Sequence, residues 1–294
     1  MNAVPRDSVR IAACFDLGQT LDCGQCFRWE ETGRGPDFSV WEGVALGHRL
    51  SIRQETRADG GGTLTFFCTE QEFETLWAPY FDLDCDYDRL RDGLYELSPV
   101  LREAAAFAPG IRILRQEPWE ALCSFIISQN NNIPRIKGII SRFCALCGEE
   151  LSPGVFAFPT PERVAGMDLD GLAPIRAGFR AKYILGAAKA VAGGEVDFAE
   201  IAGSPVEFGR SELQKIYGVG PKVAECALLY GFHKTACFPM DVWMKRAMEV
   251  LLPDRAPEEF GEAAGLAQQY IFHYSRMHPE LFKAGDTPNK RLTA

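Results

Sequence analysis

The sequence has no run of the roughly 18 consecutive apolar residues that a membrane-spanning helix needs. Its first residues, MNAVPRDSVRIAACFD, lack the basic and then apolar layout of a secretion signal. The C-terminal region has no cluster of cysteines, so an iron–sulfur centre held by such a cluster is not expected. We therefore expect a cytoplasmic protein that has no membrane partner.

An excess of positive charge is also missing, because 31 Lys and Arg residues stand against 40 Asp and Glu, a net charge of −9. Nucleic-acid binding favours a basic surface. The acidic residues gather in YFDLDCDYDRLRDG, EVDFAE and PDRAPEEFGE, however, whereas lysine and arginine are frequent between residues 130 and 250. A basic face on an acidic protein and an ordinary mixed surface are both compatible with this distribution.

The ten cysteines, without a secretion signal, indicate reduced thiols and not a disulfide framework. Two pairs have the spacing of metal ligands, Cys23 with Cys26 and Cys144 with Cys147. A four-thiolate zinc site would require the two pairs to meet in space, and small buried hydrophobic residues are the alternative interpretation. We expect no metal and no other cofactor.

The pattern of apolar residues predicts an α+β protein. The runs FSVWEGVAL, RLSIRQ and TLTFFC favour an N-terminal antiparallel β-sheet, and a capping-box pattern at Thr69 and Glu72 then introduces helical spacing. Prolines at helix starts and glycines at helix ends delimit the later helices. We predict an N-terminal β domain with a flanking helix over 1–100, an all-helical body over 101–285 and a tail over 286–294.

The stretch LQKIYGVGPKVAEC places a glycine-containing hairpin between two helical patterns. Gly218 and Gly220 permit a tight turn with positive φ, and Pro221 suits the first turn of the next helix. Unpaired amides of the hairpin and of the helix start would suit an anionic phosphate. The pattern therefore predicts a helix-hairpin-helix element.

Lys222 lies at the start of the second helix of this element. The positive end of the helix dipole disfavours a cation there and so favours a neutral amine, which is a nucleophile that can form a Schiff base. The alternative is a surface lysine that pairs with phosphate. Asp241, in FPMDVWMKR, is either an ordinary helix N-cap or a carboxylate that stabilises a cationic sugar and assists proton transfer.

A GVGxK hairpin followed by a P-x-D-V aspartate resembles the helix-hairpin-helix DNA glycosylase superfamily, whose lysine marks the bifunctional glycosylase/lyase members. Within it, the sequence is similar to the 8-oxoguanine DNA glycosylases with an extra N-terminal domain. The segments GQCFRW, SQNNNIPRI, GFRAKY and AGLAQQYIF agree with that branch in the same order, over most of the chain.

This resemblance implies a base excision repair enzyme that acts as a monomer on double-stranded DNA containing 8-oxoguanine. The enzyme flips the damaged base, excises it through a Schiff base at Lys222 with Asp241, and cleaves the strand by β-elimination as an AP lyase. Such an enzyme would be located at the nucleoid in a prokaryote or in the nucleus in a eukaryote.

The resemblance also implies a pocket for the extruded base. The carbonyl of Gly24 would accept the N7 hydrogen that distinguishes 8-oxoguanine from guanine. Phe272 would stack on the base with Cys226 behind it, and Gln268 would bond the Watson–Crick edge. Helical spacing places Gln268 and Phe272 on one face. From the residues alone, Gly24 is a plain turn glycine, and Phe272 and Cys226 are ordinary core residues.

Further residues are implied to bind DNA around the flipped base. Phe179 would be the wedge that fills the vacated stack, as tyrosine often does in the family. The cytosine opposite the lesion would be read by Asn130, Arg135 and Arg180. Phosphate would be bound by Gly218, Val219 and Gly220. Asparagines at a bend are equally explained as caps of the two flanking helices.

Two positions depart from the better-known eukaryotic pattern of the family. Trp243 stands where a histidine often follows the aspartate, which leaves a phosphate contact there open. Tyr230 occupies a pocket position more often held by methionine, and we expect looser strictness for cytosine opposite the lesion. Two rival functions are an alkylated-base glycosylase, which lacks the lysine, and a non-catalytic module that binds DNA through the hairpin alone.

Overall fold

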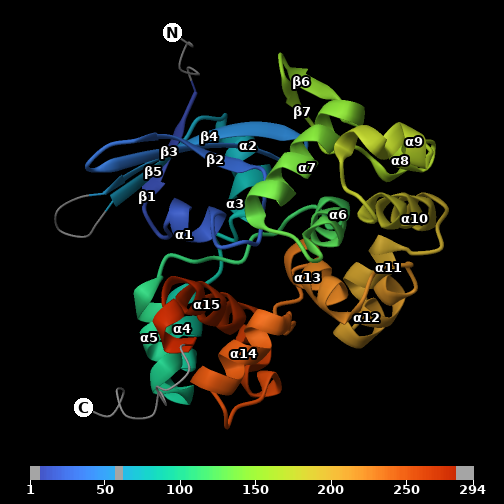
Figure 1. Cartoon of the computed structure of the whole chain (residues 1–294). Coiled ribbons are helices and arrows are strands. Elements are labelled where there is room, and N and C mark those ends of the chain that lie inside the picture. Colours follow the sequence, from blue (N-terminus) through green and yellow to red (C-terminus); the bar gives the residue numbers. More distant parts are fainter. Residues whose placement is uncertain (1–6, 57–61, 283–294) are drawn as a thin grey trace.

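The computed structural model describes residues 7–56 and 62–282, so the tail predicted over 286–294 lies outside the described residues. It confirms the predicted N-terminal sheet, which has five antiparallel strands in the order β1-β5-β4-β3-β2 (Figure 1). The strands are β1 (Val9–Ala12), β2 (Trp29–Arg34), β3 (Phe38–Ala45), β4 (His48–Thr56) and β5 (Gly62–Phe66).

Local sequence explains the sheet's hairpin and its buried face. Strands β3 and β4 are joined by Leu46 and Gly47, which have φ of 53° and 75°. Positive φ at both positions matches the right-handed twist of the strands that the turn connects. In the middle of β4 every second side chain is buried, namely Leu50, Ile52 and Gln54, so one face of the sheet packs inward.

Short helices and an aromatic cluster cover the sheet. The helices are α1 (Leu17–Leu21), α2 (Glu70–Glu72), η1 (Phe73–Trp77) and α3 (Ala78–Tyr80). The predicted capping box is confirmed, because the Thr69 amide donates to Glu72 at 2.9 Å and the Glu72 amide donates to the Thr69 hydroxyl at 3.2 Å. The indole of Trp29 donates to the Tyr80 hydroxyl at 3.0 Å within the cluster, which anchors β2.

The rest of the described chain is a helical body. Its α-helices are α4 (Tyr87–Leu97), α5 (Pro99–Phe107), α6 (Pro118–Ser128), α7 (Ile133–Cys147), α8 (Pro161–Ala165), α9 (Leu169–Leu172), α10 (Arg180–Ala192), α11 (Phe198–Gly203), α12 (Val206–Gln214), α13 (Pro221–Gly231), α14 (Val242–Leu251) and α15 (Ala264–Met277). The 3-10 turns are η2 (Ala173–Ile175), η3 (Pro257–Ala263) and η4 (Pro279–Phe282). A short antiparallel pair, β6 (Glu150–Ser152) with β7 (Val155–Phe156), follows α7. Within the described ranges, no helix has both the length and the apolar character needed to cross a membrane.

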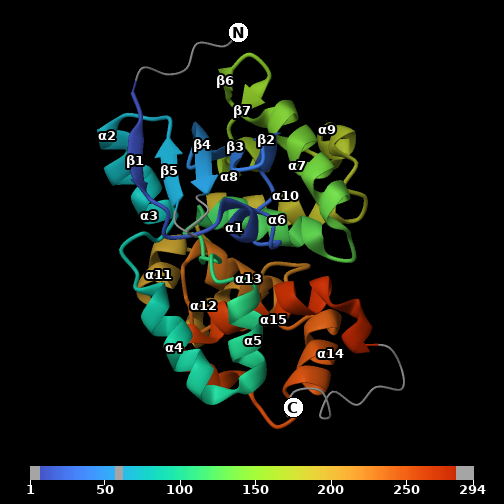
Figure 2. The ribbon, with the colours of Figure 1, turned by 90° about the vertical axis from the view of Figure 1, so that its left-hand side faces the viewer.

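Packing of helices from distant parts of the sequence positions the site. Helix α6 packs against α13, and α5 packs against the late helix α15. Figure 2 shows α4 and α5 beside α15, apart from the sheet that precedes them in the sequence. After the N-terminal sheet, the chain therefore forms α4 and α5 beside the C-terminal helix α15, and it then continues into α6.

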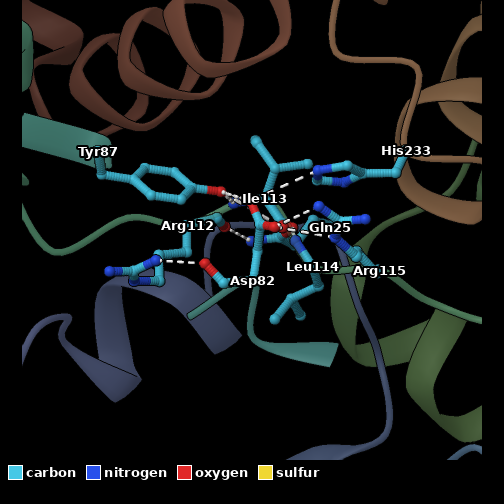
Figure 3. Close-up of polar contacts among 8 residues, drawn as sticks. All are labelled: Gln25, Asp82, Tyr87, Arg112, Ile113, Leu114, Arg115 and His233. Atoms are coloured by element: carbon cyan, nitrogen blue, oxygen red, sulfur yellow. Dashed lines mark hydrogen bonds and ion pairs between the residues drawn. The ribbon is translucent and has the colours of Figure 1, made fainter. Parts of the chain in front are cut away.

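A buried carboxylate joins these parts. The Oδ1 atom of Asp82 accepts hydrogen bonds of 2.8 Å and 2.7 Å from Arg115, and Oδ2 accepts one of 2.9 Å from Tyr87 (Figure 3). His233, just beyond α13, lies 3.4 Å from the same Oδ2 atom. Burial alone would raise the pKa of Asp82, but the bonds from His233 and Arg115 outweigh it and lower this pKa from 3.8 to about 2.

Candidate active site

The helix-hairpin-helix element is formed by α12, a turn and α13. Gly218 has a φ of +91°, and a Cβ atom there would lie 2.3 Å from the ring of Tyr183, so only glycine fits. The expectation of positive φ is wrong at Gly220, which has a φ of −93°. Gly220 is the N-cap of α13, where extended backbone is usual for any residue.

The amides at this turn are only partly available for a phosphate. Val219 is an exception to the predicted open amides, because its N–H donates to the Ile216 carbonyl at 3.0 Å and its side chain is buried. Gly220 has no side chain with which to cap α13. The first-turn amides of α13 have no intrahelical partners, so binding of a phosphate by these amides stays a prediction.

Lys222 is the second residue of α13, and its half-buried side chain reaches toward α6. Its Nζ atom lies 3.3 Å from the Oγ atom of Ser128 and 5.0 Å from the centre of the Phe125 ring. Cys226 lies one turn further along the helix, where burial raises its pKa to about 11 although Lys222 opposes the shift. The amine therefore contacts a hydroxyl acceptor and an aromatic ring, both on α6.

Asp241 is the N-cap of α14, and its Oδ1 atom accepts a 2.7 Å hydrogen bond from the Met244 amide. The cap interpretation is therefore correct, and the same carboxylate also lines a pocket that it shares with Lys222. Among the ion pairs of the described residues, none involves Lys222 or Asp241. Both side chains thus line the pocket without an ion pair between them.

The pocket has a volume of about 480 Å³, within the range typical of small-molecule sites. It lies where the segment after α1 meets α6, the start of α7, α13, the start of α14 and α15. Its lining residues are Gly24, Phe27, Phe125, Ser128, Asn131, Asn132, Ile133, Ile136, Lys222, Asp241, Trp243, Phe272 and Arg276. The two residues predicted to be catalytic therefore share one pocket with two of those predicted to bind the base.

Gly24 and Phe272 lie against each other in the pocket wall. Gly24 has a φ of +90°, and a Cβ atom there would lie 3.5 Å from the Phe272 ring. Arg276, one turn beyond Phe272 on α15, has its guanidinium carbon 5.4 Å from the centre of that ring. Arg276 was not expected from the sequence, and its spacing of four residues from Phe272 is the only signal for it.

The other two residues predicted to bind the base are buried and are not among those that line the pocket. Cys226 is 3% and Gln268 is 5% exposed. The Oε1 atom of Gln268 accepts hydrogen bonds of 2.9 Å from Nε2 of Gln269 and of 3.4 Å from the Tyr230 hydroxyl. Tyr230 stacks on Phe125 with ring centres 5.2 Å apart, so it supports the pocket from behind. The predicted roles of Cys226 and Gln268 stay predictions.

The loop between α6 and α7 is shaped by Arg180, which is only 2% exposed. Its Nε atom donates to the Gln129 carbonyl at 2.8 Å, and its Nη2 atom donates to the Asn130 carbonyl at 2.8 Å. Asn130 has a φ of +48°. Arg180 therefore holds the loop through backbone acceptors, and reading of the opposite cytosine by this side chain stays a prediction.

The neighbouring asparagines act as caps, as the alternative interpretation held. Asn132 is the N-cap of α7, and its side chain accepts a 3.1 Å hydrogen bond from the backbone N–H of Arg135. The side chain of Asn131 donates a 3.0 Å hydrogen bond to the carbonyl of Ile127 at the end of α6. Gln129, which was not singled out from the sequence, donates 3.1 Å to the Gly218 carbonyl. The loop and the hairpin are thereby joined.

A surface groove of about 590 Å³ beside this loop combines basic and aromatic side chains. Arg135, Arg176 and Lys182 line it together with Phe179, which is 49% exposed. An exposed aromatic side chain among cations suits a nucleic acid strand. The basic face that the sequence left open is therefore present locally, although the whole chain is acidic.

Trp243 occupies the position of the expected histidine. Its indole lines the pocket, and its only donor, Nε1, bonds Ser275 Oγ at 2.8 Å. Its ring centre lies 5.0 Å from that of Phe282. The side chain therefore offers an aromatic surface to the pocket and no free N–H for a phosphate.

The cysteines of the two ligand-like pairs are all buried and free. Burial raises the pKa of Cys23 and of Cys144 to about 12, so both thiols stay protonated at neutral pH. Within residues 7–56 and 62–282, no group of three or more His, Cys, Asp or Glu side chains could hold a metal ion.

A glycine hairpin that presents a lysine to a pocket, with an aspartate in the same wall, defines a helix-hairpin-helix enzyme of base excision repair. The family model "8-oxoguanine DNA glycosylase, N-terminal domain" matches residues 8–122, and "HhH-GPD superfamily base excision DNA repair protein" matches residues 123–262. The chain belongs to the N-glycosylase/DNA lyase family with these two domains.

Known proteins are similar to this chain over almost its whole length. A probable N-glycosylase/DNA lyase of Methanothermobacter thermautotrophicus is 30% identical over 301 residues, which is 89% of this chain and 94% of that protein. The structure of MBOgg1 with a low-affinity DNA ligand has a TM-score of 0.84 at 39% identity, covering 92% of this chain and 96% of that one. The Clostridium acetobutylicum 8-oxoguanine glycosylase/lyase, with dsDNA containing cytosine opposite 8-oxoG, has a TM-score of 0.82 at 34% identity, covering 93% and 97%.

Proposed function

We propose that this chain excises 8-oxoguanine from duplex DNA and then cleaves the strand at the abasic site, with Lys222 as nucleophile and Asp241 as its partner. The observation that supports the proposal is the shared pocket of about 480 Å³, which Lys222 and Asp241 line together with Gly24 and Phe272. A flipped base needs such a pocket next to the nucleophile.

Binding begins at the DNA backbone. A phosphate binds at the N-terminus of α13, where Gly220 leaves the first-turn amides uncovered. The groove with Arg135 and Lys182 follows the strand, and the exposed ring of Phe179 fills the space that the extruded base leaves. Binding energy from the backbone thus offsets the unstacking of the base.

The extruded base is recognised between Gly24 and the face of Phe272. 8-Oxoguanine carries a hydrogen on N7, which the carbonyl of Gly24 accepts. Guanine has a lone pair at N7, which that carbonyl repels. One well-placed acceptor therefore separates the two bases, and a site built to pair a donor leaves a buried group unpaired with the wrong base.

The reaction proceeds through a covalent intermediate. The neutral amine of Lys222 attacks C1′ of the deoxyribose, the C1′–N9 bond breaks, and the base leaves with the bonding electrons. Asp241 stabilises the positive charge that develops on the sugar. The C1′–O4′ bond then breaks as an amine proton passes to O4′, which opens the sugar ring and leaves a protonated imine between C1′ and Lys222. The imine loses a C2′ proton, and the C3′–O bond breaks to expel the 3′ phosphate. Water then hydrolyses the imine and restores the amine.

Borohydride trapping tests this function directly. The wild-type protein with an 8-oxoguanine duplex should give a covalent protein–DNA adduct, because borohydride reduces the imine. Lys222→Gln should abolish the adduct and still bind the lesion. Lys215→Gln is the matched control, because Lys215 pairs with Glu212 on the surface of the same element. Absence of an adduct with the wild-type protein would contradict the proposal.

The same proposal includes where the protein acts and in what oligomeric state. Its substrate is chromosomal DNA, so we place it at the nucleoid of a prokaryote or in the nucleus of a eukaryote. One protein molecule carries the hairpin, the pocket and both reactive residues, which supports action as a monomer.

A further inference from the structure

The side chain of Gln25, which follows Gly24, is fully buried, and its polar atoms are bonded. Its Nε2 atom donates to the carbonyl oxygens of Thr20 at 2.9 Å and Arg112 at 2.7 Å. Its Oε1 atom accepts a 2.9 Å hydrogen bond from the backbone N–H of Leu114. Figure 3 shows Gln25 beside the segment that contains Arg112 and Leu114. A displacement of this amide would leave several buried polar groups unpaired.

The backbone of Gln25 is held from a second direction. Its carbonyl oxygen accepts a 2.7 Å hydrogen bond from Nε2 of Gln116. The backbone N–H of Gln116 in turn donates a 2.9 Å hydrogen bond to the carbonyl oxygen of Tyr230, which belongs to α13. Hydrogen bonds therefore lead from residue 25 to the helix that carries Lys222.

Gly24 depends on this support. Glycine has the widest conformational freedom of any residue, and Gly24 has a φ of +90° in the pocket wall. Its carbonyl carbon and oxygen share one planar peptide unit with the nitrogen of Gln25. Fixing the backbone of Gln25 therefore fixes the plane in which the Gly24 carbonyl lies.

We propose that Gln25 is the positioning residue of lesion recognition, because it holds the Gly24 carbonyl in place and ties it to the helix of Lys222. The inference rests on the proposed function, since the Gly24 carbonyl must accept the N7 hydrogen. Gln25 itself does not line the pocket. Hydrogen bonds weaken steeply with distance and angle, so a small shift of the carbonyl removes the discrimination between the two bases.

This role separates two measurable steps. Excision of 8-oxoguanine requires the carbonyl of Gly24, whereas cleavage at a preformed abasic site has no base to recognise and requires only Lys222. A residue that positions Gly24 should affect the first step far more than the second. A residue that merely stabilises the fold should affect both steps together.

Gln25→Leu tests the proposal, because leucine fills a similar volume and forms none of the four side-chain hydrogen bonds of Gln25, the fourth of which runs from Nε2 to Sγ of Cys23 at 3.3 Å. We expect single-turnover excision from an 8-oxoguanine:cytosine duplex to fall by about tenfold or more, and cleavage of an abasic duplex to be largely retained. In a Lys222→Gln background, the ratio of affinities for lesion and undamaged duplexes should fall by a similar factor.

Gln54→Leu is the matched control. Gln54 is also a buried glutamine, which accepts 2.9 Å from the Leu17 amide and donates 3.2 Å to Asp16, on the sheet and away from the pocket lining. This variant should lose stability while excision and abasic cleavage change together. If Gln25→Leu does not fold, Gln116→Met tests the proposal instead, because it removes only the hydrogen bond to the Gln25 carbonyl. Excision should again fall more than abasic cleavage, by a smaller factor than in Gln25→Leu.

The outcomes distinguish the two hypotheses. A wild-type protein without preference for the 8-oxoguanine duplex would overturn the proposed function itself. A wild-type preference that Gln25→Leu and Gln116→Met both keep would overturn the positioning role alone. Equal losses of excision and abasic cleavage in Gln25→Leu would also overturn it, because they indicate a purely structural residue.

Discussion

The Nζ atom of Lys222 lies 3.3 Å from the Oγ atom of Ser128. The Ser128 hydroxyl donates its own hydrogen to the Phe125 carbonyl at 2.8 Å, so it faces the lysine with a lone pair. A single acceptor at the end of α6 thereby sets the direction of the amine on α13. In the proposed function, the packing of these two helices therefore positions the nucleophile.

Ser128→Ala should slow base excision by about fivefold, the value of one hydrogen bond of about 1 kcal/mol. Single-turnover kinetics measure the change, and borohydride should still trap the adduct because the lysine is intact. Ser211→Ala is the control, because Ser211 makes the same 2.8 Å bond to the carbonyl three residues earlier, on α12. An unchanged rate in Ser128→Ala would show that the contact does not orient the amine.

Gly218→Ala should lower the free energy of unfolding by about 1–3 kcal/mol, because alanine is strained at this φ and its Cβ meets the Tyr183 ring. Affinity for duplex DNA should fall as the hairpin shifts. Gly220→Ala should change stability far less, since nothing lies within 4 Å of a Cβ there. Urea unfolding and duplex binding of the two variants test this, and equal effects would contradict it.

Asp82 should make the fold sensitive to acid. Its pKa is about 2 in the folded protein against 3.8 ordinarily, so its contribution is complete above about pH 5 and is lost as the pH falls through 4 toward 2. The contribution is about 2 kcal/mol. Urea unfolding from pH 7 to pH 2.5 should show the wild type and Asp82→Asn converging at the acid end.

Asp84→Asn controls for the removal of charge, because Asp84 is an exposed carboxylate on the same segment. It should change stability little. A constant difference between wild type and Asp82→Asn across the whole range would mean that the carboxylate is not a determinant of acid stability.

Local chemistry made much of the fold predictable. Proline at a first turn and glycine at a helix end act within a few residues. Helices α6, α7 and α13 begin with such a proline, and α7, α10 and α13 end at or just before a glycine. The capping box at Thr69 is equally local. The φ of Gly220 was mispredicted because glycine is compatible with many conformations, and its neighbours decide which one it adopts.

The site was less visible because its contacts are non-local. The hydrogen bond between Gln116 and the carbonyl of Gln25 spans 91 positions, and the one between Arg180 and Asn130 spans 50. Spacing along a helix or strand contains no information about such pairs. The reactive residues were found because a hairpin places Lys222 by local rules, whereas the groups that hold Gly24 and the loop are known only from the fold.

Trp243 gives the protein a built-in optical reporter. The sequence contains five tryptophans, and Trp29, Trp41, Trp77 and Trp119 are each at most 5% exposed. Trp243 alone lines the pocket. A base that enters the pocket changes the surroundings of this one indole while the other four stay in the core. The filling of the pocket can thus be followed by intrinsic fluorescence, without a label on protein or DNA and before any bond is broken.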